Sequence, residues 1–91
     1  MQITFDPAKS ERNIRERGLS FERAAEFDFN SAVTELEYRN GEWRFVAKGF
    51  LGDRLHVLVF LELEDNIRVI SFRKANQREM KSYEESRRNL E

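Results

Sequence analysis

One stretch near the C-terminus decides how the chain folds: Ile67-Arg68-Val69-Ile70-Ser71-Phe72-Arg73-Lys74-Ala75-Asn76. A run of strand-forming residues ends there on two consecutive cations, Arg73 and Lys74, and passes directly into a polar segment. This order predicts a strand that is followed at once by a helix. Two cations at the end of a strand also form a place that can hold an anion.

The positive charge of this stretch is local. Residues 68–81 contain five bases and one acid, which are Arg68, Arg73, Lys74, Arg78, Lys81 and Glu79. The whole chain, in contrast, has a formal net charge of −1. A basic strand end in a nearly neutral domain suits recognition of one phosphate group, whereas proteins that coat a long polyanion use a broad positive surface.

Length and composition predict a single globular domain over residues 1–91. The chain is 40% hydrophobic and 36% charged and contains eight Phe, which is enough apolar material for a modest core. It has no cysteine and one histidine, so we expect neither a disulfide framework nor a metal site or other cofactor. No apolar run is long enough for a signal peptide or membrane span, and we expect a cytoplasmic protein without membrane contact.

The first third of the chain predicts a strand and two helices. The strand is expected at Gln2–Phe5 and the first helix at Pro7–Arg17, because Asp6 can cap a helix that Pro7 starts. Gly18 ends that helix, and Ser20 can cap a second one. The apolar side of the second helix would consist of Phe21, Ala24, Ala25 and Phe27 or Phe29. The two helices should form a small hairpin.

From residue 31 the hydrophobic period changes to two, which is typical of strands. Four strands are predicted, at residues 31–38, 42–50, 55–63 and 67–73, and the short turns between them favour an antiparallel meander. Asn76 and Glu79 have the spacing of a capping box that opens a C-terminal helix, whose thin apolar stripe should dock weakly. The predicted fold class is therefore α+β: a strand, a two-helix hairpin, a four-stranded antiparallel meander and a helix.

The side on which His56 lies depends on the length of the turn at Gly52-Asp53. A two-residue turn puts His56 on the side of Trp43, Phe45 and Phe60, where it would be structural. A three-residue turn puts it on the side of Arg44, where it could act as a proton shuttle near neutral pH. We expect the alternating aromatic residues to form core. In the last strand, strict alternation puts Ser71 and Arg73 on one side and the residues Arg68, Ile70 and Phe72 on the other.

Short motifs occur in a characteristic order along nearly the whole chain. They are Phe5-Asp6-Pro7 with Lys9 and Asn13, Gly18-Leu19-Ser20-Phe21-Glu22 with Ala25, Glu42 and Arg44 with Gly52, and residues 67–75 followed by Glu79 and Tyr83. In order and spacing they resemble the BrnT toxins of type II toxin–antitoxin systems. Two positions depart from that pattern: Arg17-Gly18 stands in place of His-Gly, and Leu63 stands where the family has an arginine in the turn before the last strand.

The resemblance implies a RelE-like fold and an endoribonuclease that arrests growth by degrading RNA. It also implies a BrnA-like antitoxin, encoded beside the toxin, that wraps it and supplies a DNA-binding domain through which the complex represses its own operator. The site residues that it carries over are Lys9, Glu42, Arg44, Arg73 and Lys74.

The chemistry of metal-free RNA cleavage agrees with these residue types. Attack of a 2′-hydroxyl on the adjacent phosphate needs a proton acceptor, stabilisation of the phosphoryl oxygens and a proton donor for the leaving oxygen. Arg44, Arg73 and Lys74 suit the phosphoryl oxygens, while Glu42 or His56 could accept the proton. Two alternatives remain: a catalytically weak homologue that mainly binds an antitoxin, which Leu63 and Arg17 would favour, and a plain nucleic-acid-binding module.

Overall fold

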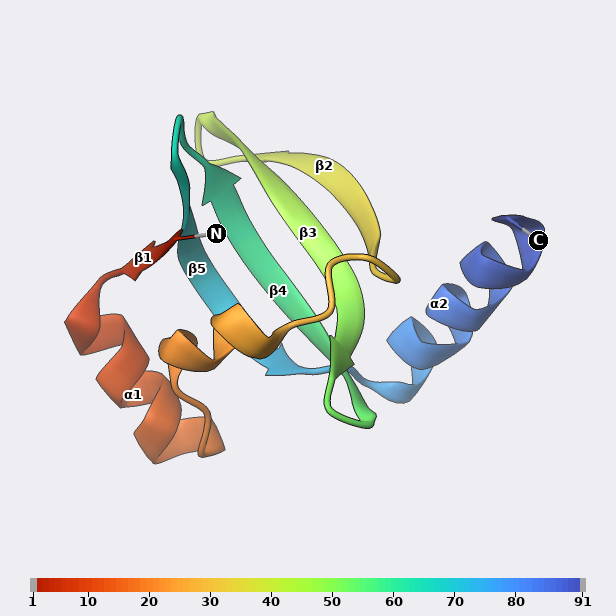
Figure 1. The fold of residues 1–91 in the computed structure, drawn as a ribbon, viewed down its shortest axis with the longest axis horizontal. Helices are drawn as coiled ribbons and strands as arrows, with labels where there is room; N and C mark the ends of the chain where they lie inside the picture. The colour runs from red at the N-terminus through yellow and green to blue at the C-terminus, as the bar shows by residue number, and fades with distance from the viewer. Residues whose placement is uncertain (1, 91) are drawn as a thin grey trace.

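The structure, a computed structural model that describes residues 2–90, is an α+β fold (Figure 1). In chain order its elements are β1 (Gln2–Phe5), α1 (Pro7–Arg17), the 3₁₀ helix η1 (Phe21–Glu26), β2 (Val33–Arg39), β3 (Glu42–Leu51), β4 (Arg54–Glu62), β5 (Asn66–Lys74) and α2 (Gln77–Leu90). The predicted class and order of elements are confirmed, but the second helix is a six-residue 3₁₀ helix.

All five strands of the described chain belong to one sheet, in the order β1-β5-β4-β3-β2. Strands β2 to β5 follow each other as an antiparallel meander, whereas β1 pairs in parallel with β5, from Gln2 opposite Asn66 to Phe5 opposite Val69. The prediction of a four-stranded antiparallel sheet is therefore wrong, because the sheet has five strands and is mixed. The parallel pair joins residues 64 positions apart, and a four-residue pattern does not specify such a distant partner.

The helix ends follow from the capping residues. Asp6 Oδ1 accepts a hydrogen bond from the Ala8 N–H at 2.9 Å. Gly18 ends α1 with a left-handed φ of 67°, and its N–H donates to the Ile14 carbonyl at 2.8 Å. Ser20 caps η1 by accepting from the Glu22 N–H. Local chemistry thus sets these boundaries where the sequence predicts them.

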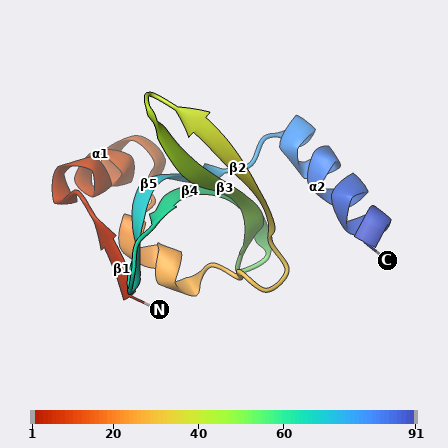
Figure 2. The same cartoon turned by 90° about the horizontal axis from the view of Figure 1, so that it is seen from above.

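The sheet curls, and η1 lies on its concave side while α2 lies on its convex side (Figure 2). The larger hydrophobic core fills the concave side and consists of Leu19, Phe21, Ala24, Phe27, Ala47, Leu51, Leu58, Phe60, Ile67, Val69 and Phe72. A smaller cluster on the convex side consists of Leu55, Val57, Ala75 and Tyr83. Phe60 is a core residue as predicted, Phe45 packs against the core, and Phe72 is fully buried in it. Trp43 is exposed, so its assignment to the core is wrong.

Strand β5 contains an irregularity that changes which residues face the core. Val59 pairs with Ser71 and Phe60 pairs with Val69, so Ile70 is an extra residue in β5. Because of this bulge, Val69 and Phe72 are both buried, while Arg68 is exposed and shares the convex side with Ser71 and Arg73. The strict alternation expected for this strand is therefore wrong on the N-terminal side of the bulge.

Helix α1 lies at the open edge of β5, beyond the end of β1 (Figure 1). Asn13 of α1 is buried, and its Nδ2 donates to the carbonyls of Leu19 and Phe72, both at 2.9 Å. Arg17 Nη1 in turn donates to Asn13 Oδ1 at 2.8 Å. The Asn13 side chain thus provides a hydrogen-bond donor for the Phe72 carbonyl of β5, which has no partner on β1. It also fixes the C-terminal end of α1 against the sheet.

Helix α2 starts with the predicted capping box. The Glu79 N–H donates to Asn76 Oδ1 at 2.8 Å, and the Asn76 N–H donates to Glu79 Oε1 at 2.9 Å. Tyr83 is the one buried residue of the described helix, and its hydroxyl donates to the Ser31 carbonyl at 2.8 Å. Neither α1 nor α2, over the residues described, has the length and apolar character that crossing a membrane requires.

Candidate active site

A cavity of about 570 Å³ opens where the ends of several elements meet. Its lining residues are Arg17, Gly18, Leu19, Arg23, Leu51, Arg54, His56, Arg73 and Lys74. Five of these side chains are cations, one is an imidazole, and none of the lining residues in the described chain is acidic. The strand end singled out in the sequence is therefore one wall of a basic cavity.

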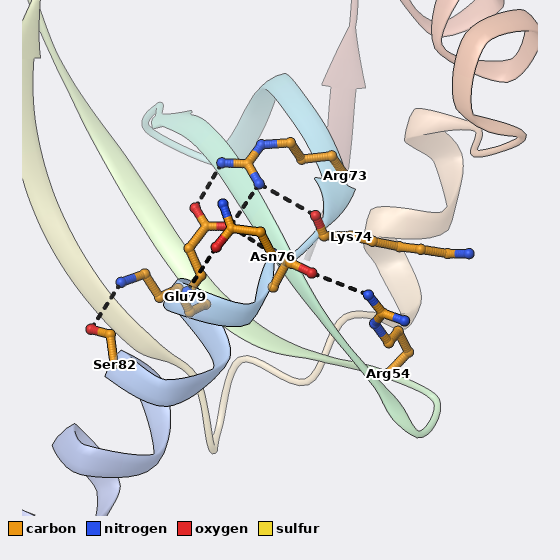
Figure 3. Close-up of polar contacts among 8 residues, drawn as sticks. Arg54, Arg73, Lys74, Asn76, Glu79 and Ser82 are labelled. Carbon is orange, nitrogen blue, oxygen red and sulfur yellow. Dashed lines mark hydrogen bonds and ion pairs between the residues drawn. The ribbon is translucent and has the colours of Figure 1, made fainter.

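Arg54 and Lys74 contribute charge from the ends of two paired strands. Arg54 is the first residue of β4, and its Nη2 donates to the Ala75 carbonyl at 3.1 Å. Lys74 is the last residue of β5 and extends away from Arg73, toward the side of η1 (Figure 3). One guanidinium is thus held by a hydrogen bond while the exposed Lys74 lines the same cavity, a combination that suits a phosphate group.

Arg73 reaches the cavity wall from the convex side of β5, where its guanidinium is held by α2 (Figure 3). Its Nη1 and Nη2 donate to the two carboxylate oxygens of Glu79, both at 2.8 Å. The hydrogen bonds from Arg73 lower the pKa of Glu79 to about 2, with burial acting in the opposite direction and the Asn76 N–H adding to the effect. This bidentate pair keeps both groups charged and presents Arg73 in one orientation.

The turn at Gly52-Asp53 has two residues, because Leu51 pairs with Arg54 and Gly49 with His56. His56 therefore lies on the concave side, as expected for the two-residue turn, and is only 4% exposed. This burial agrees with the structural role expected for that register, and His56 is in addition one of the residues that line the basic cavity.

The protonation of His56 follows from its surroundings. Burial lowers its pKa below 6.5, and the hydrogen bond to the Arg54 carbonyl acts in the opposite direction. Its Nδ1 lies 2.8 Å from that carbonyl oxygen, which can only accept, so Nδ1 carries the hydrogen. The neutral ring then has its lone pair on Nε2, the nitrogen that can take up a proton.

Three of the predicted site residues lie outside this cavity. Arg44 is on the convex side of β3, where its Nη2 contacts Glu42 Oε1 at 3.1 Å. Arg44 Nε is buried, and no hydrogen-bond partner for it is found among residues 2–90. Lys9 lines a separate cavity of about 170 Å³ beside α1. The fold therefore brings together Arg73, Lys74 and His56, but not Arg44, Glu42 or Lys9.

Sequence reasoning missed three cations of the cavity: Arg17, Arg23 and Arg54. Arg17 is the last residue of α1 and Arg54 follows the β3–β4 turn, so each stands at the end of an element. Arg23 lies on η1 and pairs with Glu26 at 3.3 Å. One feature of the sequence did point to position 17 as part of the site: the family pattern has a titratable histidine where this chain has Arg17.

The curled sheet of this α+β fold carries a cavity lined by five cations and an imidazole, a combination that suits the binding of phosphate groups. The family model described as "Ribonuclease toxin, BrnT, of type II toxin-antitoxin system" matches residues 5–79. The chain therefore belongs to the BrnT family, and it is a ribonuclease toxin of a type II toxin–antitoxin system. Membership implies an antitoxin partner and an RNA target, and it does not favour the catalytically weak alternative.

Structural comparison agrees with this assignment. The crystal structure of the ribonuclease toxin BrnT of Brucella abortus is similar, with a TM-score of 0.69 and 28% sequence identity. The match covers 85% of this chain and 99% of that one. A sequence search of curated proteins gives no match.

Proposed function

We propose that the chain cleaves RNA in the basic cavity, without a metal ion, by attack of a 2′-hydroxyl on the adjacent phosphate. The observation that carries this proposal is the composition of the cavity wall, which has five cations and the imidazole of His56. Preorganised cations stabilise the charge that develops on the phosphoryl oxygens, and a neutral imidazole accepts the proton of the attacking hydroxyl.

The roles follow from the positions of the side chains. His56 Nε2 takes the proton of the 2′-hydroxyl as its oxygen bonds to phosphorus. Arg54, Arg73 and Lys74 hold the phosphoryl oxygens, and as the bond to the 5′ oxygen breaks, the Lys74 ammonium donates a proton to that leaving oxygen. The products are a 2′,3′-cyclic phosphate and a free 5′-hydroxyl.

Arg44, Glu42 and Lys9 belong to the proposal in a different role. Arg44 and Glu42 lie on the convex side of the sheet and Lys9 lies beside α1, at positions that the family pattern marks with charged groups. We assign Arg44 and Lys9 to contacts with RNA phosphates beyond the scissile one, and Glu42 to the orientation of Arg44, with which it pairs.

The proposal includes the finer features that the family likeness implies. The fold is assigned to the RelE-like class. The partner is a BrnA-like antitoxin encoded beside the toxin, the complex reaches operator DNA only through that antitoxin, and the toxin acts in the cytoplasm.

Degradation of labelled RNA in EDTA tests the site. Lys74→Ala is the informative variant, because Lys74 is exposed, and Lys81→Ala, an exposed cation on α2 outside the cavity, is the matched control. Loss of a phosphate-stabilising cation should slow cleavage by about 10- to 1,000-fold, while the control cleaves like the wild type.

Arg44→Ala separates the two groups of residues in the same assay. We expect a loss of less than about tenfold, because a contact remote from the reacting phosphate contributes mainly to binding. Equal cleavage by wild type and Lys74→Ala, with a large loss in Arg44→Ala, would contradict the cavity and move the reaction to the convex side of the sheet.

A further inference from the structure

A second surface, far from the basic cavity along the sheet, carries the exposed aromatic and aliphatic side chains. Leu36 is 60% exposed, Tyr38 59% and Trp43 63%. In the antiparallel register Tyr38 pairs with Trp43 and Leu36 pairs with Phe45, so all four share one side of the sheet. That side is the concave one, because Phe45 stacks on the core residue Phe60 with ring centroids 5.5 Å apart.

This apolar surface continues into a second cavity, of about 320 Å³, at the β4–β5 turn. Phe60 links the two, because it touches Phe45 on one side and lines the cavity on the other. Phe29 and Leu63 line the same cavity, and Leu63 is 45% exposed. We call the surface formed by Leu36, Tyr38, Trp43, Phe45 and this second cavity the apolar surface.

The fold itself leaves the apolar surface uncovered. Helix η1 fills the part of the concave side nearer the basic cavity, and α2 is on the convex side (Figure 2). Tyr38 and Trp43 contact each other edge to face, with centroids 5.1 Å apart. Four of the six large hydrophobic residues that are exposed in the described chain lie on this one surface. Such clustering marks an interaction site rather than ordinary surface scatter.

Charge indicates which kind of partner fits. Glu62 and Asp65 line the second cavity, and no cation is among its lining residues in the described chain. The acidic residues of this cavity repel RNA phosphates. In a symmetric dimer of this chain they would lie opposite the same acidic residues of the second copy and repel them as well. A protein segment that carries apolar anchors next to Lys or Arg is complementary to it.

We propose that the antitoxin docks on the apolar surface through an amphipathic segment. The aromatic or aliphatic side chains of that segment pack on Leu36, Tyr38 and Trp43 and enter the cavity beside Leu63. Its basic residues face Glu62 and Asp65. The inference rests on the proposed function, because it takes the antitoxin as the partner. The two cavities share no lining residue, so docking here leaves the basic cavity open. A different part of the antitoxin must therefore block RNA.

Titration calorimetry with the purified antitoxin encoded beside this chain tests the surface. Trp43→Ser and Leu36→Ser should each weaken binding by at least about tenfold, as expected for central apolar anchors. Ile14→Ser is the matched control, because Ile14 is an exposed aliphatic residue on α1, outside the apolar surface, and its replacement should leave the affinity unchanged. The variants are first shown to be folded by circular dichroism.

A second pair of variants tests the electrostatic contribution to antitoxin binding. Asp65→Lys should weaken antitoxin binding severalfold at low salt, and the effect should shrink as salt is added. Glu85→Lys reverses an exposed acid on α2 and should leave the affinity unchanged.

Several outcomes would overturn the inference. They are wild-type affinity in both serine variants, no antitoxin binding by the wild-type chain, or a dimer of this chain in sedimentation velocity that Trp43→Ser dissociates. RNA cleavage by Trp43→Ser, measured in parallel, should match the wild type. If the wild type cleaves no RNA while the serine variants still lose the antitoxin, the proposed function fails and the docking surface stands.

Discussion

Gly49 illustrates how one missing side chain sets the distance between the η1 segment and the sheet. A Cβ at this position would lie 2.6 Å from Phe27 Cζ and 3.0 Å from Ala32 Cβ. Both neighbours are packed on the concave side, so neither can move without disturbing the core. The requirement comes from a close approach and not from the backbone conformation.

Gly49→Ala should lower the free energy of unfolding by about 1–3 kcal/mol, because an extra methyl group overpacks the core. Urea denaturation followed by circular dichroism measures the effect. The same substitution in a Phe27→Leu background should be less destabilising, since the clashing ring atom is gone. Equal losses in the two backgrounds would contradict the clash with Phe27.

His56 is buried and also lines the basic cavity. Its ring lies 5.5 Å from the Phe72 ring, and its Nδ1–H is used by the Arg54 carbonyl. Burial lowers its pKa below 6.5, so the neutral, proton-accepting form persists at mildly acidic pH. In the proposed mechanism, the packing of His56 therefore keeps its ring in the form that accepts a proton.

The rate of RNA cleavage should consequently have an acid limb with a midpoint below pH 6.5, because activity is lost only when His56 becomes protonated. Single-turnover rates in EDTA between pH 4.5 and 8 measure it. Lys74→Ala should lower the whole profile without moving this midpoint to higher pH. A midpoint above 6.5 would contradict the role of the buried imidazole.

Among the elements, α2 depends most on a few polar contacts. Tyr83 is its one buried residue in the described range, and the Arg73–Glu79 pair ties its first turn to the end of β5. The hydrogen bonds from Arg73 lower the pKa of Glu79 from 4.5, the value of a free carboxyl, to about 2 in the folded chain. Because the folded state favours the charged form, this stabilisation is present above pH 4.5 and declines as the pH falls toward 2.

Glu79→Gln should therefore lower the free energy of unfolding at pH 7 by about 1–2 kcal/mol, since the pair is partly exposed and screened. The difference from the wild type should shrink steadily below pH 4.5. Urea denaturation across this pH range measures it, with Glu84→Gln, an exposed glutamate of the same helix, as the control. A difference that stays constant down to pH 2.5 would sink this assignment.

At the level of helices and strands, some features of this fold are predictable from the sequence and others are not. Asp6, Gly18, Ser20, and Asn76 with Glu79 act on their immediate neighbours, so the starts and ends of helices were predictable. The parallel pairing of β1, the extra residue Ile70 and the meeting of Arg17, Arg23 and Arg54 around His56 depend on contacts between distant segments. Local patterns do not contain that information, and half of the predicted site residues lie outside the basic cavity.

In the whole molecule, positive and negative side chains are concentrated in two different cavities, although the chain as a whole is nearly neutral. The cavity near the end of α1 is lined by five cations, and the one at the β4–β5 turn by two acids. A net charge of −1 hides this separation. RNA should therefore be held at a few phosphates rather than along a broad surface.

Binding of a short 2′-O-methyl RNA, which resists cleavage, should accordingly depend only moderately on salt. Seven contacts, five in the cavity and one each from Arg44 and Lys9, at about 0.7 each give a slope of log K against log salt that is no steeper than about −5. Fluorescence anisotropy at several salt concentrations measures this slope. A markedly steeper slope would mean that cations other than those of the cavity, Arg44 and Lys9 dominate binding.

The pairing of β1 with β5 also bears on when the toxin becomes active during its synthesis. The first strand of the sheet finds its partner only when residues 66–69 have been made, and the cavity needs residues as late as Lys74. Contacts between such distant segments form late in folding. A growing chain on the ribosome therefore contains no finished cavity until its residues up to Lys74 have emerged, and a shorter chain poses no hazard to the RNA of the cell.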